Sequence, residues 1–208
     1  LFNEPEQVFV YPGFLETLPF RELQSGFAEI IKHYLIADAP AFDELYKENK
    51  PLAEFDWPPT IEKSIAIKST IVAQDPLEHG ARKALNFGHT IGHAVESLFM
   101  EKGEGRLLHG EAVAIGVLAE GFISKKLTGL QNDELEKMAA AIGKYYTLPV
   151  VPPNDFGKVL DYISQDKKNA GGGNNFTLLK SIGNYCINNN VEEGLITDSL
   201  KYYNSLQA

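Results

Sequence analysis

The stretch from Gly80 to Ala112 constrains the fold most strongly, because it places three of the chain's five histidines within apolar runs. His89 and His93 are four residues apart, so on a helix they share one face and point into the same space. His109 opens the next apolar segment, after a polar, glycine-containing loop at 101–106. Such a loop lets a second helix fold back on the first. The spacing therefore predicts two neighbouring helices that bring the three imidazoles together.

Apolar residues recur at helical spacing through most of the remaining chain. The predicted helices are Arg21–Ile36, Ala41–Asn49, Thr60–Ala73, Gly110–Leu127, Asn132–Tyr146, Asp155–Lys168 and Ile196–Leu206. Thr60 is expected to cap the third of these. Alternating residues at 176–179 and 185–187 predict a small hairpin around Gly183. A hydrophobic fraction of 44% is enough for a large core, so we expect a mainly α, multihelical single domain over residues 1–208.

The first residues of the chain resemble the end of a segment that precedes this sequence. Gln7 to Tyr11 alternates like a strand, but no early partner strand follows, so it resembles the end of a sheet or a linker separated from its source. The chain also begins without methionine and without a signal-like region. We therefore expect either a processed protein or a piece of a longer one.

Composition excludes several classes of partner. A formal net charge of -9 argues against a non-specific nucleic-acid or membrane-surface partner, since both would repel the chain. No apolar run approaches the roughly 18 residues of a membrane span. The single cysteine, Cys186, rules out an internal disulfide and is typical of a reducing compartment. We expect a cytoplasmic location.

Glu29 lies within the apolar pattern of the first long helix, with Lys32 and His33 on adjoining turns. A lone glutamate there is ordinarily a paired or solvated carboxylate. Together with two imidazoles, however, it would form a two-histidine, one-carboxylate set that binds zinc and leaves a fourth position open. The alternative is that His89 and His93 are satisfied core residues. Spacing alone does not say which two of the three histidines would bind metal.

Three runs carry a resemblance to the signature blocks of 3-dehydroquinate synthase, a sugar-phosphate cyclase family. They are SGFAEIIK at 25–32, LNFGHTIGHA at 85–94 and LHGEAV at 108–113. The likeness continues through residues 14–19, Lys68, the turn at 78–82 and residues 166–168, so it covers nearly the whole chain in the same order.

The resemblance implies a domain arrangement. In that family an N-terminal dinucleotide-binding α/β domain precedes a helical domain that carries metal and substrate groups, and this chain resembles the second domain only. The glycine-rich nucleotide motif is absent, since Gly171–Gly173 follows a helix and precedes none. Residues 1–19 would then be the connector from the missing domain. That domain is an expected partner, as is a second copy of the chain in a homodimer.

The resemblance also implies roles for individual residues. Glu29, His89 and His109 match ligands of zinc, or of cobalt, while His93 and Glu78 match groups that transfer protons. The matched substrate contacts are Lys32, Lys68, Arg82, Asn86 and one of Lys167 and Lys168. Phe14, Leu15, Glu16 and Thr17 match a connector that lies against bound NAD. The implied reaction converts 3-deoxy-D-arabino-heptulosonate 7-phosphate to 3-dehydroquinate and phosphate, by transient oxidation, phosphate elimination, reduction and aldol closure.

Two other functions are weighed against this one. A related cyclase, such as a 2-deoxy-scyllo-inosose or valiolone-type synthase, would share the metal site and differ in residues that face the substrate. A non-catalytic helical module that binds metal or pairs with another chain is the other alternative. It gains support because, without a dinucleotide domain, the 208 residues alone should show no turnover.

Overall fold

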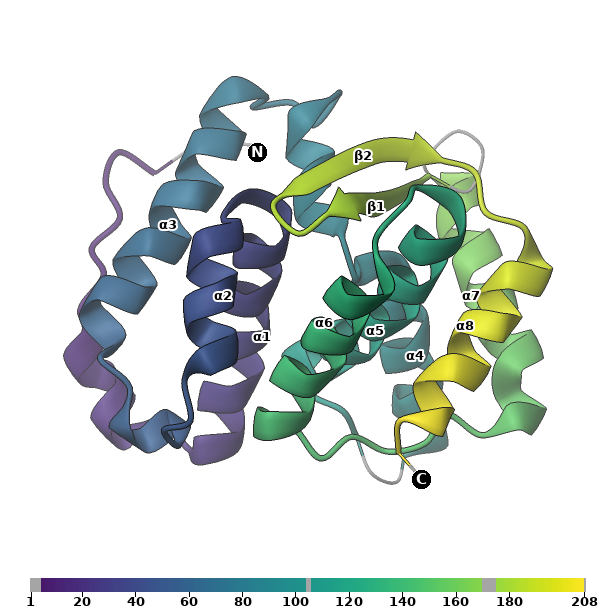
Figure 1. Ribbon diagram of the computed structural model, residues 1–208, viewed down its shortest axis with the longest axis horizontal. Helices are drawn as coiled ribbons and strands as arrows, with labels where there is room; N and C mark the ends of the chain where they lie inside the picture. The colour runs from purple at the N-terminus through teal and green to yellow at the C-terminus, as the bar shows by residue number, and fades with distance from the viewer. Residues whose placement is uncertain (1–4, 104–105, 170–174, 208) are drawn as a thin grey trace.

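The computed structural model describes residues 5–103, 106–169 and 175–207, without the side chains of 166–169. In this part of the chain, eight α-helices and one β-hairpin confirm the mainly α prediction (Figure 1). Their bounds are α1 Phe20–Ala37, α2 Ala39–Lys47, α3 Trp57–Gln74, α4 His89–Lys102, α5 His109–Leu127, α6 Asn132–Tyr145, α7 Phe156–Asn169, β1 Phe176–Ser181, β2 Asn184–Asn189 and α8 Glu193–Ser205. Most agree with the predicted ranges to within three residues.

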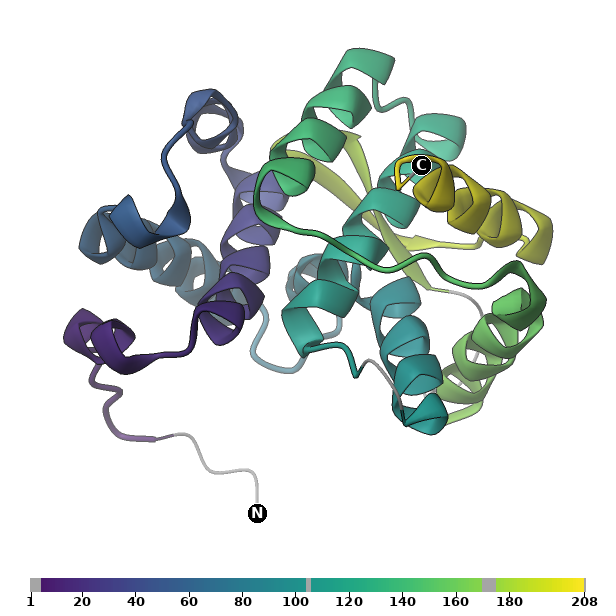
Figure 2. The ribbon, with the colours of Figure 1, turned by 90° about the horizontal axis from the view of Figure 1, so that it is seen from below.

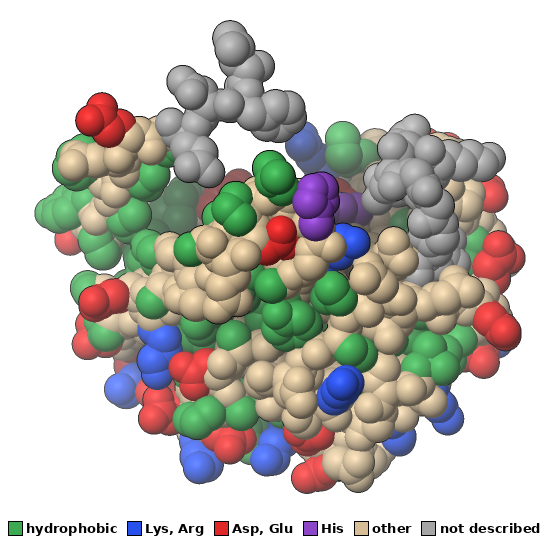
Figure 3. Space-filling view, turned by 90° about the horizontal axis from the view of Figure 1, so that it is seen from above, with side chains coloured by type: hydrophobic (Ala, Val, Ile, Leu, Met, Phe, Trp, Pro, Cys, Tyr) green, Lys and Arg blue, Asp and Glu red, His purple; other side chains and the backbone are tan. Residues whose placement is uncertain are grey.

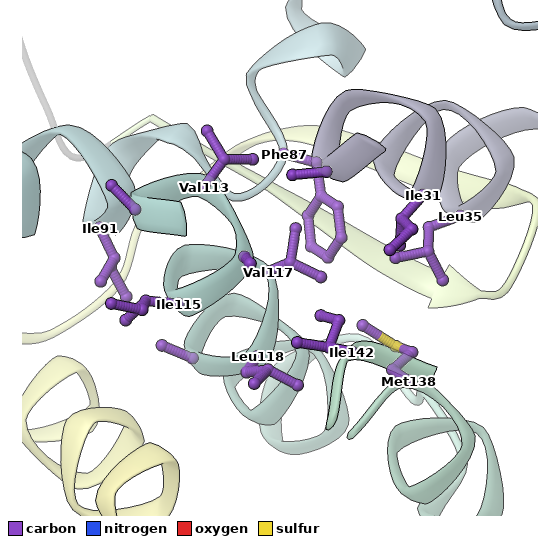
Figure 4. Packing of buried hydrophobic residues seen from close by; sticks show 14 of the residues in the cluster. Ile31, Leu35, Phe87, Ile91, Val113, Ile115, Val117, Leu118, Met138 and Ile142 are labelled. Carbon is purple, nitrogen blue, oxygen red and sulfur yellow. The ribbon is translucent and has the colours of Figure 1, made fainter. Parts of the chain in front are cut away.

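Helix α5 is the centre of the fold and contacts α1, α4, α6, α8 and β1. Its residues are buried nearly all round, which is typical of a helix that lies inside a core. Figure 4 shows Val117 of α5 beside Phe87, with Ile31 of α1 and Met138 of α6 nearby. In Figure 1, α1, α2 and α3 lie on one side of α5, α7 and α8 lie on the other, and the hairpin lies above α5 and α6.

Two glycines of α5 allow its neighbours to approach at backbone distance. A Cβ atom on Gly116 would lie 1.9 Å from the carbonyl oxygen of Gly88, directly before α4. A Cβ atom on Gly110 would lie 1.9 Å from the carbonyl oxygen of Ser25 in α1. Only glycine fits at either position. The N-terminal half of α5, which begins with His109, is therefore packed directly against both α1 and the start of α4.

The predicted cap of the third helix is wrong. Helix α3 begins at Trp57, so Thr60 lies within its first turns, where its hydroxyl donates to the carbonyl oxygen of Asp56 at 2.8 Å. The prediction placed Pro58 and Pro59 in the loop before the helix, because proline is usually excluded from helix interiors. In the first turn they are tolerated, since N–H groups there have no intrahelical partner to lose.

The strand-like segment at residues 7–11 forms no strand in the described structure and is exposed. It leads away from the helices, as Figure 2 shows. The predicted hairpin is confirmed, with antiparallel pairing of β1 and β2 and Gly183 at a φ of 84° in the turn between them. The run Gly171–Gly173 lies outside the described residues. Among the helices described here, none has both the length and the apolar character needed to cross a membrane.

Candidate metal and substrate site

His89 is the first residue of α4, and a buried glutamate side chain from α5 holds that helix end in place. Glu120 accepts hydrogen bonds from the backbone N–H groups of Gly88 at 2.7 Å and Ile91 at 3.0 Å. These N–H groups would otherwise have no partner at the start of a helix. Burial raises the pKa of the Glu120 carboxyl to about 8, against the opposing effect of these backbone donors. Glu120 thus fixes the backbone that carries His89.

His109 is the first residue of α5, and α1 holds that helix end. Glu111 accepts from the backbone N–H of Leu108 at 2.8 Å and from the guanidinium of Arg21 through Nε at 2.6 Å and Nη2 at 2.7 Å. One turn further along α1, the hydroxyl of Ser25 accepts from the N–H of Gly110 at 3.0 Å. These bonds set the position of His109 relative to α1, the helix that carries Glu29.

The carboxylate of Glu29 meets the imidazoles of His89 and His109. Its Oε1 lies 3.5 Å from His89 Nε2 and 3.8 Å from His109 Nε2. Ligands of a tetrahedral zinc ion, each about 2.0–2.1 Å from the metal, are roughly 3.3–3.4 Å apart. Nitrogen atoms of His89, His93 and His109 also lie within 4.8 Å of one another. The prediction that the three histidines converge is confirmed.

The hydrogen bonds of the two rings indicate which nitrogen is free for a metal. His89 Nδ1 lies 3.2 Å from the carbonyl oxygen of Phe87, which can only accept, so Nδ1 carries the proton and Nε2 keeps a lone pair. His109 Nδ1 lies 3.3 Å from Glu96 Oε2, with the same consequence. Glu29 Oε1 is buried and accepts no hydrogen bond from the described residues. Three lone pairs therefore face one small space, an arrangement that fits a cation.

Lys32 controls the charge of Glu29. Its ammonium, almost fully buried, donates to Glu29 Oε2 and to the carbonyl oxygen of Leu85, each at 2.7 Å. Burial raises the pKa of the Glu29 carboxyl, but the charge and hydrogen bond of Lys32 outweigh it and hold that pKa below its usual value. Burial and the same charge lower the pKa of His89 to about 4. At neutral pH Glu29 is thus an ionised carboxylate and His89 a neutral imidazole, which are the forms that bind metal.

A polar cavity of about 390 Å³ opens beside these groups. Its lining includes Lys68, Glu78, Arg82 and Asn86, all predicted site residues, together with His33. Glu78 has a left-handed backbone, with a φ of 59°, and its Oε1 accepts from the amide of Asn86 at 2.7 Å. A non-glycine residue in this region is uncommon and is often found at functional sites. Figure 3 shows histidine at the surface with acidic and basic side chains close by.

His93 lies in the same cluster. Its ring centre is 5.1 Å from that of His89 and 5.5 Å from that of His109. It lines a second polar cavity, of about 470 Å³, which shares Glu78, Asn86 and His89 with the first. Distance alone therefore allows His93 to act either as a ligand or as a proton-transfer group.

Two predicted groups are not brought to this cluster in the described structure. Phe14, Leu15, Glu16 and Thr17 lie in a short 3₁₀ helix, Pro12–Thr17. There Leu15 and Glu16 line a different groove, together with Phe55 and Trp57. Lys167 and Lys168 are near the end of α7, and their side chains are outside the described part. The roles expected for both groups stay predictions.

Sequence reasoning missed three glutamates that support the site: Glu96, Glu111 and Glu120. Glu96 follows His89 by seven residues, so helical periodicity could have placed it on the histidine face of α4. Glu111 is the third residue of α5, where an acidic side chain commonly binds the preceding backbone N–H. Glu120 interrupts an apolar helix, a position where a charge needs a partner. The buried contact of His33 Nδ1 with Ser64 Oγ, at 2.7 Å, had no signal in the sequence.

Comparison with solved structures identifies the class of this fold. A 2-epi-5-epi-valiolone synthase from Streptomyces hygroscopicus subsp. jinggangensis, solved with NAD+ and Zn2+, superposes with a TM-score of 0.74 at 25% identity, over 93% of this chain and 54% of that one. A 2-deoxy-scyllo-inosose synthase, solved with carbaglucose-6-phosphate, NAD+ and Co2+, has a TM-score of 0.70 at 21% identity, over 89% and 52% of the two chains. The fold is that of the sugar-phosphate cyclases.

Sequence comparison narrows the class to one family. The profile described as "3-dehydroquinate synthase C-terminal" matches residues 26–169. The 3-dehydroquinate synthase of Parabacteroides distasonis is 39% identical over 97% of this chain and 57% of its own length, and that of Geobacillus kaustophilus is 41% identical over 94% and 54%. The chain belongs to the 3-dehydroquinate synthase C-terminal family, as its motifs predicted. It spans about half the length of these curated relatives.

Proposed function

We propose that this chain is the metal- and substrate-binding half of a 3-dehydroquinate synthase, which forms 3-dehydroquinate and phosphate from 3-deoxy-D-arabino-heptulosonate 7-phosphate. The observation that carries the proposal is the convergence of Glu29 Oε1 with Nε2 of His89 and of His109 beside a cavity lined by cations. The 39–41% identity to enzymes named for this activity favours it over other cyclase reactions.

Glu29, His89 and His109 would hold a zinc or cobalt ion, because three lone pairs already face the same space and Glu29 Oε1 has no other donor among the described residues. Three protein ligands leave one position for a substrate oxygen. When bound, the ion would act as a Lewis acid and make a substrate hydroxyl more acidic. Lys32 holds the other oxygen of Glu29, so the carboxylate presents Oε1 in a fixed direction.

Lys68 and Arg82 give the cavity the positive charge that a substrate with a carboxylate and a phosphate requires. The guanidinium of Arg82 donates to the carbonyl oxygen of Pro76 at 2.7 Å, which restrains its orientation. Asn86 adds an amide that can bind substrate hydroxyls, and its bond to Glu78 fixes which way the amide faces. These contacts would orient the substrate toward the histidines.

His93 and Glu78 are the proposed proton-transfer groups. Imidazole changes protonation closer to neutral pH than any other side chain, which suits a group that must both accept and return a proton. Both residues line the second cavity beside His89. A base in that position can reach a substrate held at the metal without itself being a ligand.

A second domain would complete the enzyme. The proposed N-terminal domain binds NAD, which accepts and returns a hydride when bound, and residues 1–19 would connect that domain to α1. Exposed apolar side chains in this segment support a covering partner, since Phe9 is 89% and Phe14 74% exposed. A homodimer and a cytoplasmic location stay predictions.

Two other functions can be separated by experiment. A valiolone-type cyclase is favoured by the structural likeness to the Streptomyces enzyme, and product analysis with each candidate substrate distinguishes it. A non-catalytic metal-binding module would bind zinc and remain inactive even when the NAD-binding domain is supplied. Both alternatives share the metal site. The related cyclase would form a different product from the proposed synthase, and the non-catalytic module would form none.

The first test measures zinc affinity of the purified chain by competition with a chromophoric chelator. We expect weak zinc binding that Glu29→Gln reduces by more than about tenfold, because a neutral amide is a poor zinc ligand. Glu22→Gln is the matched control, since Glu22 is an exposed glutamate on the same helix. Equal affinities of the two variants would contradict the metal site.

The second test measures turnover. The chain alone should form no 3-dehydroquinate with NAD and substrate, and the chain joined to its N-terminal domain should form it. Turnover by the chain alone would refute the two-domain proposal. A different carbocycle as product would instead identify one of the related cyclases.

A further inference from the structure

Glu96 is a carboxylate of the histidine cluster that is neither a proposed metal ligand nor a proposed proton-transfer group or substrate contact. It follows His89 by seven residues and His93 by three, so all three lie along one face of α4. Its Oε2 is 3.3 Å from Nδ1 of His109, which belongs to α5. Glu96 is thus a direct side-chain link between α4 and the imidazole at the start of α5.

The two imidazoles that face Glu29 differ in how they are held. The side chain of His89 is 14% exposed and its Nδ1 donates to a backbone carbonyl, so packing and the main chain fix the ring. The side chain of His109 is 45% exposed, and it lies at a helix end where the ring can rotate. For His109, a side chain must supply the acceptor that the main chain supplies for His89.

An ionised carboxylate accepts hydrogen bonds and cannot donate them. Glu96 therefore selects the form of His109 in which Nδ1 carries the proton and Nε2 does not. That leaves the Nε2 lone pair directed at the space next to Glu29 Oε1, 3.8 Å away. Without Glu96, the ring could rotate, or its proton could move from Nδ1 to Nε2. Either change would remove a ligand lone pair from that space.

We propose that Glu96 is a positioning residue that sets the tautomer and ring orientation of His109 for metal binding. The inference rests on the proposed role of His109 as a ligand. Carboxylate partners of metal-binding histidines typically affect metal affinity by about 10- to 100-fold.

Glu101 provides a matched control. It is on the same helix, five residues after Glu96, and its carboxylate binds Lys158 at 2.9 Å and Tyr162 at 2.7 Å on α7, away from the histidines. Glu96→Ala and Glu101→Ala remove the same charge from α4. Only the first removes the acceptor from His109.

The first experiment reads the protonated nitrogen of His109 directly, by ¹⁵N–¹H correlation spectroscopy of the metal-free chain at about pH 9, where imidazoles are neutral. In the unmodified chain and in Glu101→Ala, we expect the proton on Nδ1. In Glu96→Ala, we expect a shift toward Nε2. A loss of helix stability alone would not move this proton, so an unchanged tautomer in Glu96→Ala overturns the proposal.

The second experiment measures zinc affinity in a double-mutant cycle with His109→Ala. Glu96→Ala should weaken zinc binding by about 10- to 100-fold in the unmodified chain and by less than about twofold once His109 is absent. Glu96→Gln, which keeps an acceptor oxygen without the charge, should fall between. An equal loss in both backgrounds would mean that Glu96 acts through the helix and would overturn the proposal. If the unmodified chain binds no zinc, the proposed metal site fails, and the tautomer measurement still tests Glu96 by itself.

Discussion

The packing of α5 against the start of α4 makes a sharp prediction for Gly116→Ala. A Cβ atom there would lie 1.9 Å from the carbonyl oxygen of Gly88, about 1.5 Å short of an ordinary contact. Because the obstruction is backbone, it cannot rotate away, and the two helices must separate. Overpacking of this kind costs about 3 kcal/mol, while alanine regains about 1 kcal/mol of helix propensity over glycine. We expect a net loss of about 2 kcal/mol.

Gly26→Ala is the matched control, because a Cβ atom on this α1 residue would meet no atom within 4 Å. Here only the helix propensity remains, a gain of up to about 1 kcal/mol. For a chain of this size each kcal/mol shifts Tm by about 2–4 °C. Gly116→Ala should therefore melt about 4–8 °C lower, and Gly26→Ala up to about 4 °C higher, in thermal unfolding followed by circular dichroism.

The separation of α4 and α5 should also damage the metal site, since productive ligand distances tolerate only about 0.2 Å. Gly116→Ala should lose zinc affinity even at temperatures where it remains folded, whereas Gly26→Ala should keep it. If Gly116→Ala proves as stable as Gly26→Ala, the reasoning from close helix approach is refuted.

Three further predictions concern protonation, catalysis and charge. The pKa of His33 and His89 is about 4 in the folded state and 6.5 in the unfolded state. Between pH 4 and pH 6.5 the unfolded metal-free chain therefore binds more protons at these two residues, and their contribution makes the folded state more stable as the pH rises. Glu120 has a pKa of about 8 when folded and 4.5 when unfolded, so its contribution to stability falls as the pH rises from 4.5 to 8. Each group contributes a slope of about 1.4 kcal/mol per pH unit, so urea unfolding should find maximal stability near pH 6.5 and a decline toward pH 8 that Glu120→Gln abolishes; a plateau there would contradict the prediction. In the complete enzyme, His93→Ala should lose turnover and retain zinc by metal analysis, and unchanged turnover would remove His93 from the mechanism. Lys32→Met should raise the pKa of Glu29 above its usual value, because burial then acts without the opposing charge and hydrogen bond of Lys32. Zinc affinity measured across pH 4 to 7 should therefore fall off at higher pH than in the unmodified chain, and an unchanged profile would show that Lys32 does not control this carboxylate.

The local pattern of the chain was enough to predict most of its helices. The apolar periodicity of α1 and α5 and the four-residue spacing of His89 and His93 predicted helices and one shared face, because side-chain direction along a helix is fixed by geometry within a few residues. The N-cap predicted at Thr60 was wrong because local pattern alone is ambiguous there: Pro58 and Pro59 are compatible with either a loop or a first helical turn. The strand-like alternation at residues 7–11 had no partner strand to pair with in the described chain.

The sequence by itself determined the helical architecture, the histidine pair and, through its motifs, the family. Only the tertiary structure decided that Glu29 lies within 4 Å of His89 and His109, that Glu111 and Glu120 bind the helix starts that carry these histidines, and that Glu96 contacts the ring of His109. The physical reason is the distance along the chain. Helical periodicity relates residues a few positions apart, whereas Glu29 and His109 meet because Gly110 and Gly116 let α5 touch α1 and α4 at backbone distance.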